Sequence, residues 1–279
     1  MRAEIACDES GAEGENLIDA VTDVFAHASV WLSAESAQAC LLELRGRIRS
    51  PAEEYKANHL LRGKHRGTLI WLLGHDGPIH GRSGVHLVEK AFFAAGRAVD
   101  LLSGRLTYTV DTGPLALSLY RERDFLRAFN DLMRAKITAE QFSAQVATLP
   151  LQAEILVRHA QAHQDNPALL PLLDPLVPAL VRAVARWQPV SIVHDRQTTL
   201  TQDRIAQLDE LVGGPTGLRL VASRDDARVQ VADFLAGVAR KIASEELNGR
   251  GDRELTELLR PYVDPASVWG DRRSWAELS

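Results

Sequence analysis

The sequence predicts an α/β protein: a mixed sheet flanked by helices, with a long helical insertion. Short apolar runs with strand character alternate with longer stretches whose apolar residues recur at helical spacing, a pattern typical of α/β folds. Only one turn separates the first two runs, which indicates an antiparallel hairpin and therefore a mixed sheet. The five runs are residues 3–7, 24–32, 85–93, 190–195 and 218–222.

The first strand leads directly into an acidic pair. Residues 3–7 are apolar and end at Asp8 and Glu9, which Ser10 follows. The strand is therefore expected to be buried and to present carboxylates at its C-terminal end. Residues 11–16 are rich in Gly and Glu, and we expect them to form the turn into the second strand.

The next elements are helical. Ser33 is a candidate N-cap for a helix over Glu35–Ile48, whose apolar residues lie close to helical spacing. Another helix is expected over about 64–74, and a loop rich in Gly and His follows it. The strand at 85–93 is expected to run into a helix that ends near Leu102.

The middle of the chain predicts an all-helical segment. Residues 112–187 follow a helical pattern broken by prolines and contain no run of strand character. We therefore predict one domain over residues 1–279, with 112–187 as a helical insert or cap within it. The remaining expected elements are a helix over 201–212, an amphipathic helix over 227–246, a polar helix after Asn248 and an irregular end over 265–279.

Composition excludes several classes of protein. The net charge is −5 over 279 residues, which argues against a uniformly basic DNA-coating protein but allows an acidic site that needs cations. Cys7 and Cys40 lie in no spacing typical of zinc sites, and we expect buried free thiols in a reducing cytoplasm. The chain shows neither a signal peptide nor an apolar run long enough for a bilayer, so a cytoplasmic protein without membrane contact is expected.

Three carboxylates stand out because of their positions. Asp8 closes the first strand, Asp195 closes a later strand, and Asp233 interrupts the apolar face of the last long helix. A carboxylate among apolar neighbours is unfavourable unless it is paired or bound to a metal, and sites collect at the C-terminal ends of strands in α/β sheets. If the three converge, they form an oxygen-only anionic pocket that suits Mg²⁺ or Mn²⁺ rather than zinc.

Each carboxylate also has an ordinary structural explanation. Asp8 could cap the turn that begins at Ser10, and Asp195 could form an Asx turn at the end of its strand. Asp233 could lie at the edge of the buried stripe of its helix. The functional interpretation gains its weight from the three residues together.

The order of these segments resembles the domain-of-unknown-function 3800 family. The resemblance covers residues from about 3 to 245 and is weakest over 112–187. One departure is that Ala57-Asn58-His59 follows the Glu-x-Lys element, where members usually carry an aromatic or small polar residue. The matched elements are Asp8-Glu9-Ser10-Gly11, then Glu54-Tyr55-Lys56, then Val193-His194-Asp195, and finally Ser223 with the helix Gln230-Val231-Ala232-Asp233-Phe234-Leu235-Ala236-Gly237.

The resemblance implies a ribonuclease H-like fold with an acidic metal site, and through that chemistry a nuclease. Two divalent ions about 4 Å apart are expected, with Asp8 as the bridging ligand and Asp195, Asp233 and Glu54 as the other ligands. Lys56 is expected to neutralise developing charge or to position a phosphate, although it could equally be a solvated surface lysine. Gln230, on the same helix face as Asp233, and Ser10 are expected to bind the substrate.

Glu9 and several basic residues have weaker claims. Glu9 is expected to point to the opposite face of the strand from Asp8. The histidines between residues 59 and 86 are expected to be scattered loop residues rather than a metal centre, although His75 or His80 could act as an acid. The basic residues form a phosphate-binding face near Glu54 or an ordinary charged surface; they are Arg45, Arg47, Arg49, Arg62, Lys64, His65 and Arg66.

The expected partner is nucleic acid, either RNA or DNA. Two other functions remain open on the sequence alone: a non-catalytic ribonuclease H-like scaffold, and a hydrolase of a small phosphoester. The insert at 112–187 could cap the site, or bind a second copy of the chain or another protein.

Overall fold

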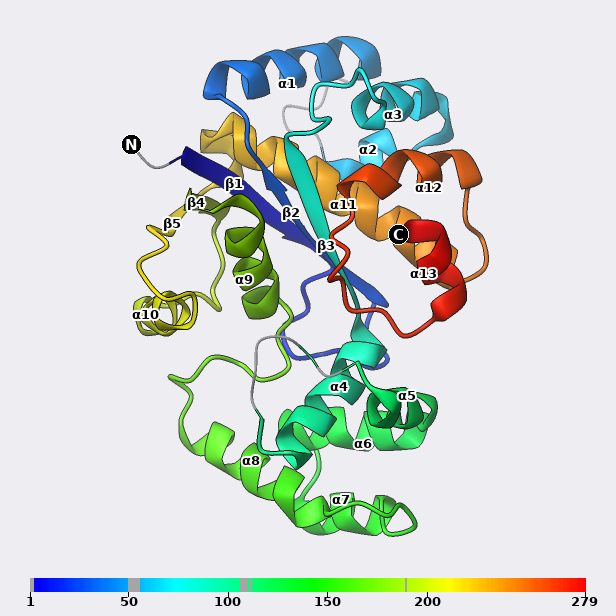
Figure 1. Cartoon of the computed structure of the whole chain (residues 1–279), viewed down its shortest axis with the longest axis vertical. Coiled ribbons are helices and arrows are strands. Elements are labelled where there is room, and N and C mark those ends of the chain that lie inside the picture. Colours follow the sequence, from blue (N-terminus) through cyan, green and yellow to red (C-terminus); the bar gives the residue numbers. More distant parts are fainter. Residues whose placement is uncertain (1–2, 50–55, 106–109, 111, 189) are drawn as a thin grey trace.

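The computed structural model describes residues 3–49, 56–105, 110, 112–188 and 190–279, and has a five-stranded sheet at its centre (Figure 1). The strand order is β3-β2-β1-β4-β5; β1, β2 and β3 are antiparallel neighbours, whereas β4 and β5 run parallel to β1. This confirms the expected α/β class and the mixed sheet. The strands are β1 (Ala3–Ser10), β2 (Val24–Val30), β3 (Ser83–Glu89), β4 (Val190–Asp195) and β5 (Arg219–Val221).

Side chains alternate along the central strand and separate two cores. Ile5 and Cys7 belong to one buried cluster, whereas Ala6 between them belongs to the other. Because β1 is covered on both faces, its run is apolar without polar alternation until the acidic pair begins. Both cysteines are buried and unpaired, as expected.

One face of the sheet packs against α1 (Ala34–Ile48) and α11 (Ala227–Leu247), whose buried residues share a cluster with Ala6. Ser33 caps α1, since its side chain accepts a hydrogen bond from the backbone of Ser36 at 3.0 Å. This side of the molecule also carries α2 (Ala57–Leu60), α3 (Arg66–Leu73), α12 (Arg253–Leu259) and α13 (Arg272–Leu278).

The opposite face packs against α9 (Leu176–Trp187), and α10 (Gln202–Leu211) lies beside it. The predicted insert at 112–187 therefore includes α9, which covers the sheet. The helices between β3 and α9 form a helical part of their own beyond the sheet end where α4 begins (Figure 1). Within the described part of 112–187 there is no strand. The helices are α4 (Lys90–Leu102), α5 (Pro114–Arg121), α6 (Arg123–Met133), α7 (Ala139–Gln145) and α8 (Ala153–Asp165).

The C-terminal segment is more regular than expected. Residues 265–279 were expected to be irregular, but Val268 makes a parallel bridge to Val88 of β3 and α13 follows. Trp269 and Leu278 are buried in the core that α11 shares. The prediction was wrong because the apolar residues here are too widely spaced to show a period. None of the helices in the described residues has the length and apolar character that a bilayer span needs.

Candidate acidic site

Strand register brings Asp8 and Asp195 to neighbouring positions. Cys7 of β1 is paired with His194 of β4 in a parallel ladder, so the next residue of each strand lies on the other face of the sheet. That face is covered by α11, which carries Asp233. Asp8 is buried, and burial raises its pKa far above the ordinary range; the charges of Glu9, Asp233 and Asp195 raise it further.

The nearby positive charge lies at the solvent-exposed edge of this acidic site. Lys56, the N-cap of α2, has its Nζ 3.3 Å from Oδ2 of Asp233, with about half of the lysine side chain exposed. Asp8 instead accepts a hydrogen bond through Oδ1 from the backbone N–H of Glu9 at 2.7 Å. A neutral amide only partly compensates a buried carboxylate, so ionisation of Asp8 is unfavourable without a cation beside it.

The other residues expected at the site are Glu54, Gln230 and Ser10. Glu54 lies outside the described residues. Gln230 is half-buried on α11, one turn before Asp233. Ser10 follows the acidic pair on β1, and its Oγ accepts a hydrogen bond from Nε of Arg240 at 2.9 Å. Among the residues that the structure describes, no three His, Cys, Asp or Glu side chains already form a group that could hold a metal ion.

Close packing of two helices sets the edge of the site. Gly237 of α11 faces Ala57 of α2 so closely that a Cβ on Gly237 would lie 2.3 Å from the Cβ of Ala57. That separation is far below van der Waals contact. Glycine at 237 therefore allows the start of α2, and with it Lys56, to lie against the helix that carries Asp233.

Gly237→Ala is expected to destabilise the protein by about 2–3 kcal/mol, because the new methyl group must push α2 away from α11. Ala57→Gly in the same chain should recover most of the loss, since it removes the opposing methyl. Gly67→Ala in α3 is the control: nothing lies within 4 Å, and helix propensity should stabilise it by roughly 0.5–1 kcal/mol. Urea unfolding measures all three, and a Gly237→Ala variant as stable as wild type would contradict the packing.

Glu9 points away from Asp8, as expected, into a buried polar row on the opposite face. Its Oε2 lies 3.5 Å from Nε2 of His194 and has no hydrogen-bond partner among the described residues, while Gln197 donates to its Oε1. Burial raises the pKa of Glu9 first, and the charges of Asp195 and Asp174 raise it further. Buried carboxylates therefore lie on both faces of β1, Asp8 on one and Glu9 on the other.

Three buried histidines continue that row across the sheet. His194 Nδ1 lies 2.8 Å from the carbonyl oxygen of Asp195, which can only accept, so this nitrogen carries the hydrogen. His27 Nε2, 3.2 Å from His194 Nε2, must then donate to it. His86, the cross-strand partner of His27, is the third. Burial first, and then the charges of His194 and His86, lower the pKa of His27.

The buried histidines predict that the protein loses stability in acid. A histidine whose pKa is lowered on folding stabilises the protein above its ordinary pKa, and this contribution disappears as the pH falls below it. Between about pH 6.5 and pH 5, wild type is expected to lose about 1 kcal/mol more than His27→Gln. Urea unfolding across that range measures the difference. His75→Gln, at an exposed residue, should lose as much unfolding free energy with falling pH as wild type. An equal loss in all three proteins would contradict the proposed effect of the buried histidines.

The histidine expectation needs correction. His86 is not a loop residue but a buried residue of β3, and His65 is also buried. The rings of His75 and His80 lie 4.7 Å apart in a tilted arrangement, and His80 meets the ring of Tyr262 edge-on, in the segment before β3 begins. That end of β3 pairs with the C-terminal end of β2, whereas Ser10 pairs near the start of β2. Asp8 itself pairs with Ala28 in the middle of β2, and an acid role for His75 or His80 stays a prediction.

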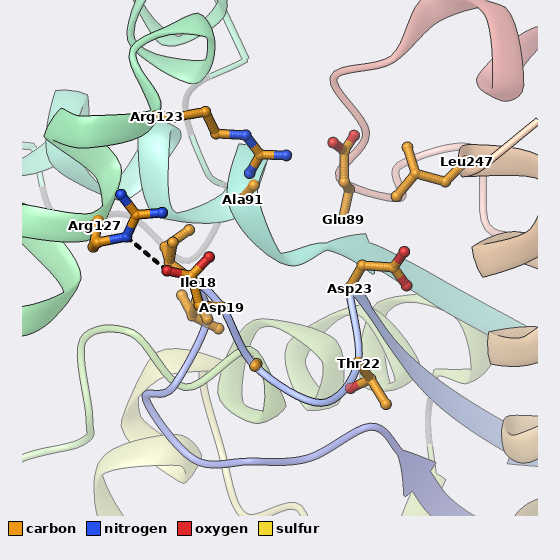
Figure 2. Close-up of a pocket in the computed structure, with 11 residues that line it drawn as sticks. Ile18, Asp19, Thr22, Asp23, Glu89, Ala91, Arg123, Arg127 and Leu247 are labelled. Atoms are coloured by element: carbon orange, nitrogen blue, oxygen red, sulfur yellow. Dashed lines mark hydrogen bonds and ion pairs between the residues drawn. The ribbon is translucent and has the colours of Figure 1, made fainter.

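A cavity of about 350 Å³ lies between the sheet end and the helical insertion, and no sequence signal indicated it (Figure 2). Asp23, Glu89 and Arg123 line it, and they also line an adjoining cavity of about 420 Å³. Its carboxylates already accept hydrogen bonds: Glu89 from the backbone of Gly270 at 2.8 Å, and Asp23 from Ser244 at 2.6 Å. These groups hold the C-terminal segment and α11 against the sheet, so we do not place the reaction here.

No family model, curated protein or solved structure matches this chain. Asp8 is a buried carboxylate with Asp195 and Asp233 as like-charged neighbours and with its countercharge at the rim. Hard oxygen donors with excess negative charge favour Mg²⁺ or Mn²⁺ over softer metals.

Proposed function

We propose that the chain is a divalent-metal-dependent phosphodiester hydrolase, a nuclease with a ribonuclease H-like fold. The observation that carries the proposal is the position of Asp8: on the central strand, buried, beside Asp195, and facing a helix with Asp233. The antiparallel β1–β3 meander with β4 and β5 parallel to β1 supports the fold assignment.

The donor chemistry fits Mg²⁺ or Mn²⁺. Asp8, Asp195 and Asp233 would hold the metal, and Glu54 is the candidate fourth ligand. Because these described side chains do not form a group that could hold a metal ion, the proposal requires Asp195 or Asp233 to turn toward Asp8 when the metal binds. When bound, such ions lower the pKa of a water and stabilise charge on a phosphodiester.

The protein's own residues supply positioning and charge. Lys56 reaches Asp233 with half of its side chain exposed, so its ammonium can also meet a phosphate oxygen that approaches from solvent. Ser10 is held by Arg240 at the end of β1, and Gln230 lies one turn along α11 from Asp233. Both offer hydrogen bonds to a substrate at the same edge of the sheet.

The test is cleavage of labelled RNA, single-stranded DNA and an RNA–DNA hybrid with Mn²⁺ or Mg²⁺. We expect cleavage of at least one substrate, and its complete loss under excess chelator. Cleavage that survives full chelation would contradict the metal requirement. Binding of an oligonucleotide without cleavage under any metal would favour a scaffold, and cleavage restricted to a mononucleotide ester would favour a small-phosphoester hydrolase.

A further inference from the structure

The segment Lys56–Arg66 combines strong positive charge with a complete lack of acidic residues. It contains four lysines and arginines and two histidines, and the next Asp or Glu after Glu54 is Asp76. In a chain whose net charge is −5, this is a local reversal of sign. Such a reversal beside an acidic site points to an anionic partner rather than to general solubility.

Both ends of the segment are fixed by contacts. At its start Lys56 pairs with Asp233, and Ala57 packs against Gly237 of α11. At its end Arg66 donates two hydrogen bonds to the carboxylate of Asp252, the N-cap of α12. The segment is therefore held against the same face of the sheet that carries Asp8, and its position does not depend on a ligand.

Between these anchors the cations face solvent. Arg62 and Lys64 are exposed, and the structure gives neither side chain an ion pair with a described residue. His65 between them is buried, and its pKa is lowered, first by burial and then by the charges of Lys64, Arg62 and His59. Lys56 and Arg66 are balanced by carboxylates, Arg66 by Glu254 as well as Asp252. Arg62 and Lys64 thus remain as the cations that no carboxylate of the described residues balances.

We infer that Lys56–Arg66 is the track on which the phosphodiester backbone of a nucleic-acid strand reaches the acidic site. This inference rests on the proposed function and names how its substrate is held. Cations spread over a segment that begins at the site match a chain of phosphates better than a single phosphate group. Exposed Lys and Arg that contact phosphates give affinity without sequence preference and with strong salt dependence.

The test measures salt dependence of binding rather than cleavage. Labelled RNA and DNA strands of about 20 nucleotides are titrated in chelator by fluorescence anisotropy, at about 50 to 200 mM salt. Arg62→Gln with Lys64→Gln is expected to weaken binding and to reduce the slope of log K against log salt by about 1.4, or about 0.7 for each lost phosphate contact. Lys64→Gln alone should reduce it by about 0.7.

The matched control removes the same charge elsewhere. Arg121→Gln with Lys136→Gln changes two exposed cations of the helical insertion and should leave both affinity and slope unchanged. An unchanged slope in the Arg62 and Lys64 variant overturns the inference. So does an equal effect of the control, or equally good competition by poly-glutamate of matched charge, which would indicate a protein partner.

The outcomes separate this inference from the proposed function. Because binding is measured in chelator, it does not require a working metal site. A reduced slope without cleavage in wild type contradicts the nuclease proposal alone. Cleavage in wild type with an unchanged slope in the variant contradicts the track alone. Equal slopes for RNA and DNA are expected, because recognition of the backbone involves the same number of phosphates in both.

Discussion

Asp8→Asn is expected to lower the metal-dependent cleavage rate by about 10³-fold or more, equivalent to about 4 kcal/mol of transition-state stabilisation. The substitution keeps the size of the side chain and its hydrogen bond to the backbone of Glu9, but it removes a negative charge from the centre of the proposed ligand set. The effect should appear in the rate rather than in substrate affinity, because the phosphate-binding cations remain.

Single-turnover cleavage at saturating Mn²⁺ measures this effect. Asp124→Asn is the matched control, since it makes the same chemical change at a fully exposed side chain of α6 and should cleave like wild type. Wild-type cleavage by Asp8→Asn on every substrate would remove Asp8 from the mechanism. A loss in both variants would point to contamination or misfolding instead.

The second large effect concerns stability without metal. Burial and neighbouring carboxylates raise the pKa of Asp8 in the folded protein, so ionising it opposes folding. A group whose pKa is raised on folding contributes stability below its ordinary pKa, and this contribution is lost as the pH rises toward the folded value. In chelator at about pH 7.5, Asp8→Asn should therefore be more stable than wild type by about 2 kcal/mol.

Divalent metal should reverse that order. A ligand that binds only the folded state stabilises it by mass action, so millimolar Mn²⁺ should raise the free energy of unfolding of wild type. Asp8→Asn should gain little, because it lacks the central ligand. Urea unfolding measures the free energy of unfolding of both proteins, each with and without Mn²⁺. If Asp8→Asn is less stable than wild type in chelator, the carboxylate is held by compensating contacts and the site is structural.

Much of the fold could be predicted because its strands are short apolar runs between clear turns. The strand at 190–195 has the bounds expected of it, and Ser33 caps α1 as expected. The C-terminal segment could not be predicted, since its apolar residues pack against β3 and α11 one at a time and not at a regular spacing. A period is visible only where one element buries one continuous face.

The candidate site was only partly accessible from the sequence. Asp8 and Asp195 could be found because each follows an apolar run, and register then makes them neighbours. Asp195 ends β4 as expected, whereas β1 continues past Asp8 to Ser10. The Glu9 and His194 contact could not be found, because it depends on which strands pair and in which register. The sequence alone also could not show the role of Gly237 in placing α2, which follows from the contact with Ala57.

The most direct test of the account is the position of Mn²⁺ in crystals soaked with this ion, located by its anomalous scattering. We expect a peak bound by the Asp8 carboxylate together with Asp195 or Asp233, and no peak at this position in Asp8→Asn crystals. A well-ordered Asp8 without a peak at saturating Mn²⁺, or with the ion bound elsewhere, would contradict a metal centre at this strand end.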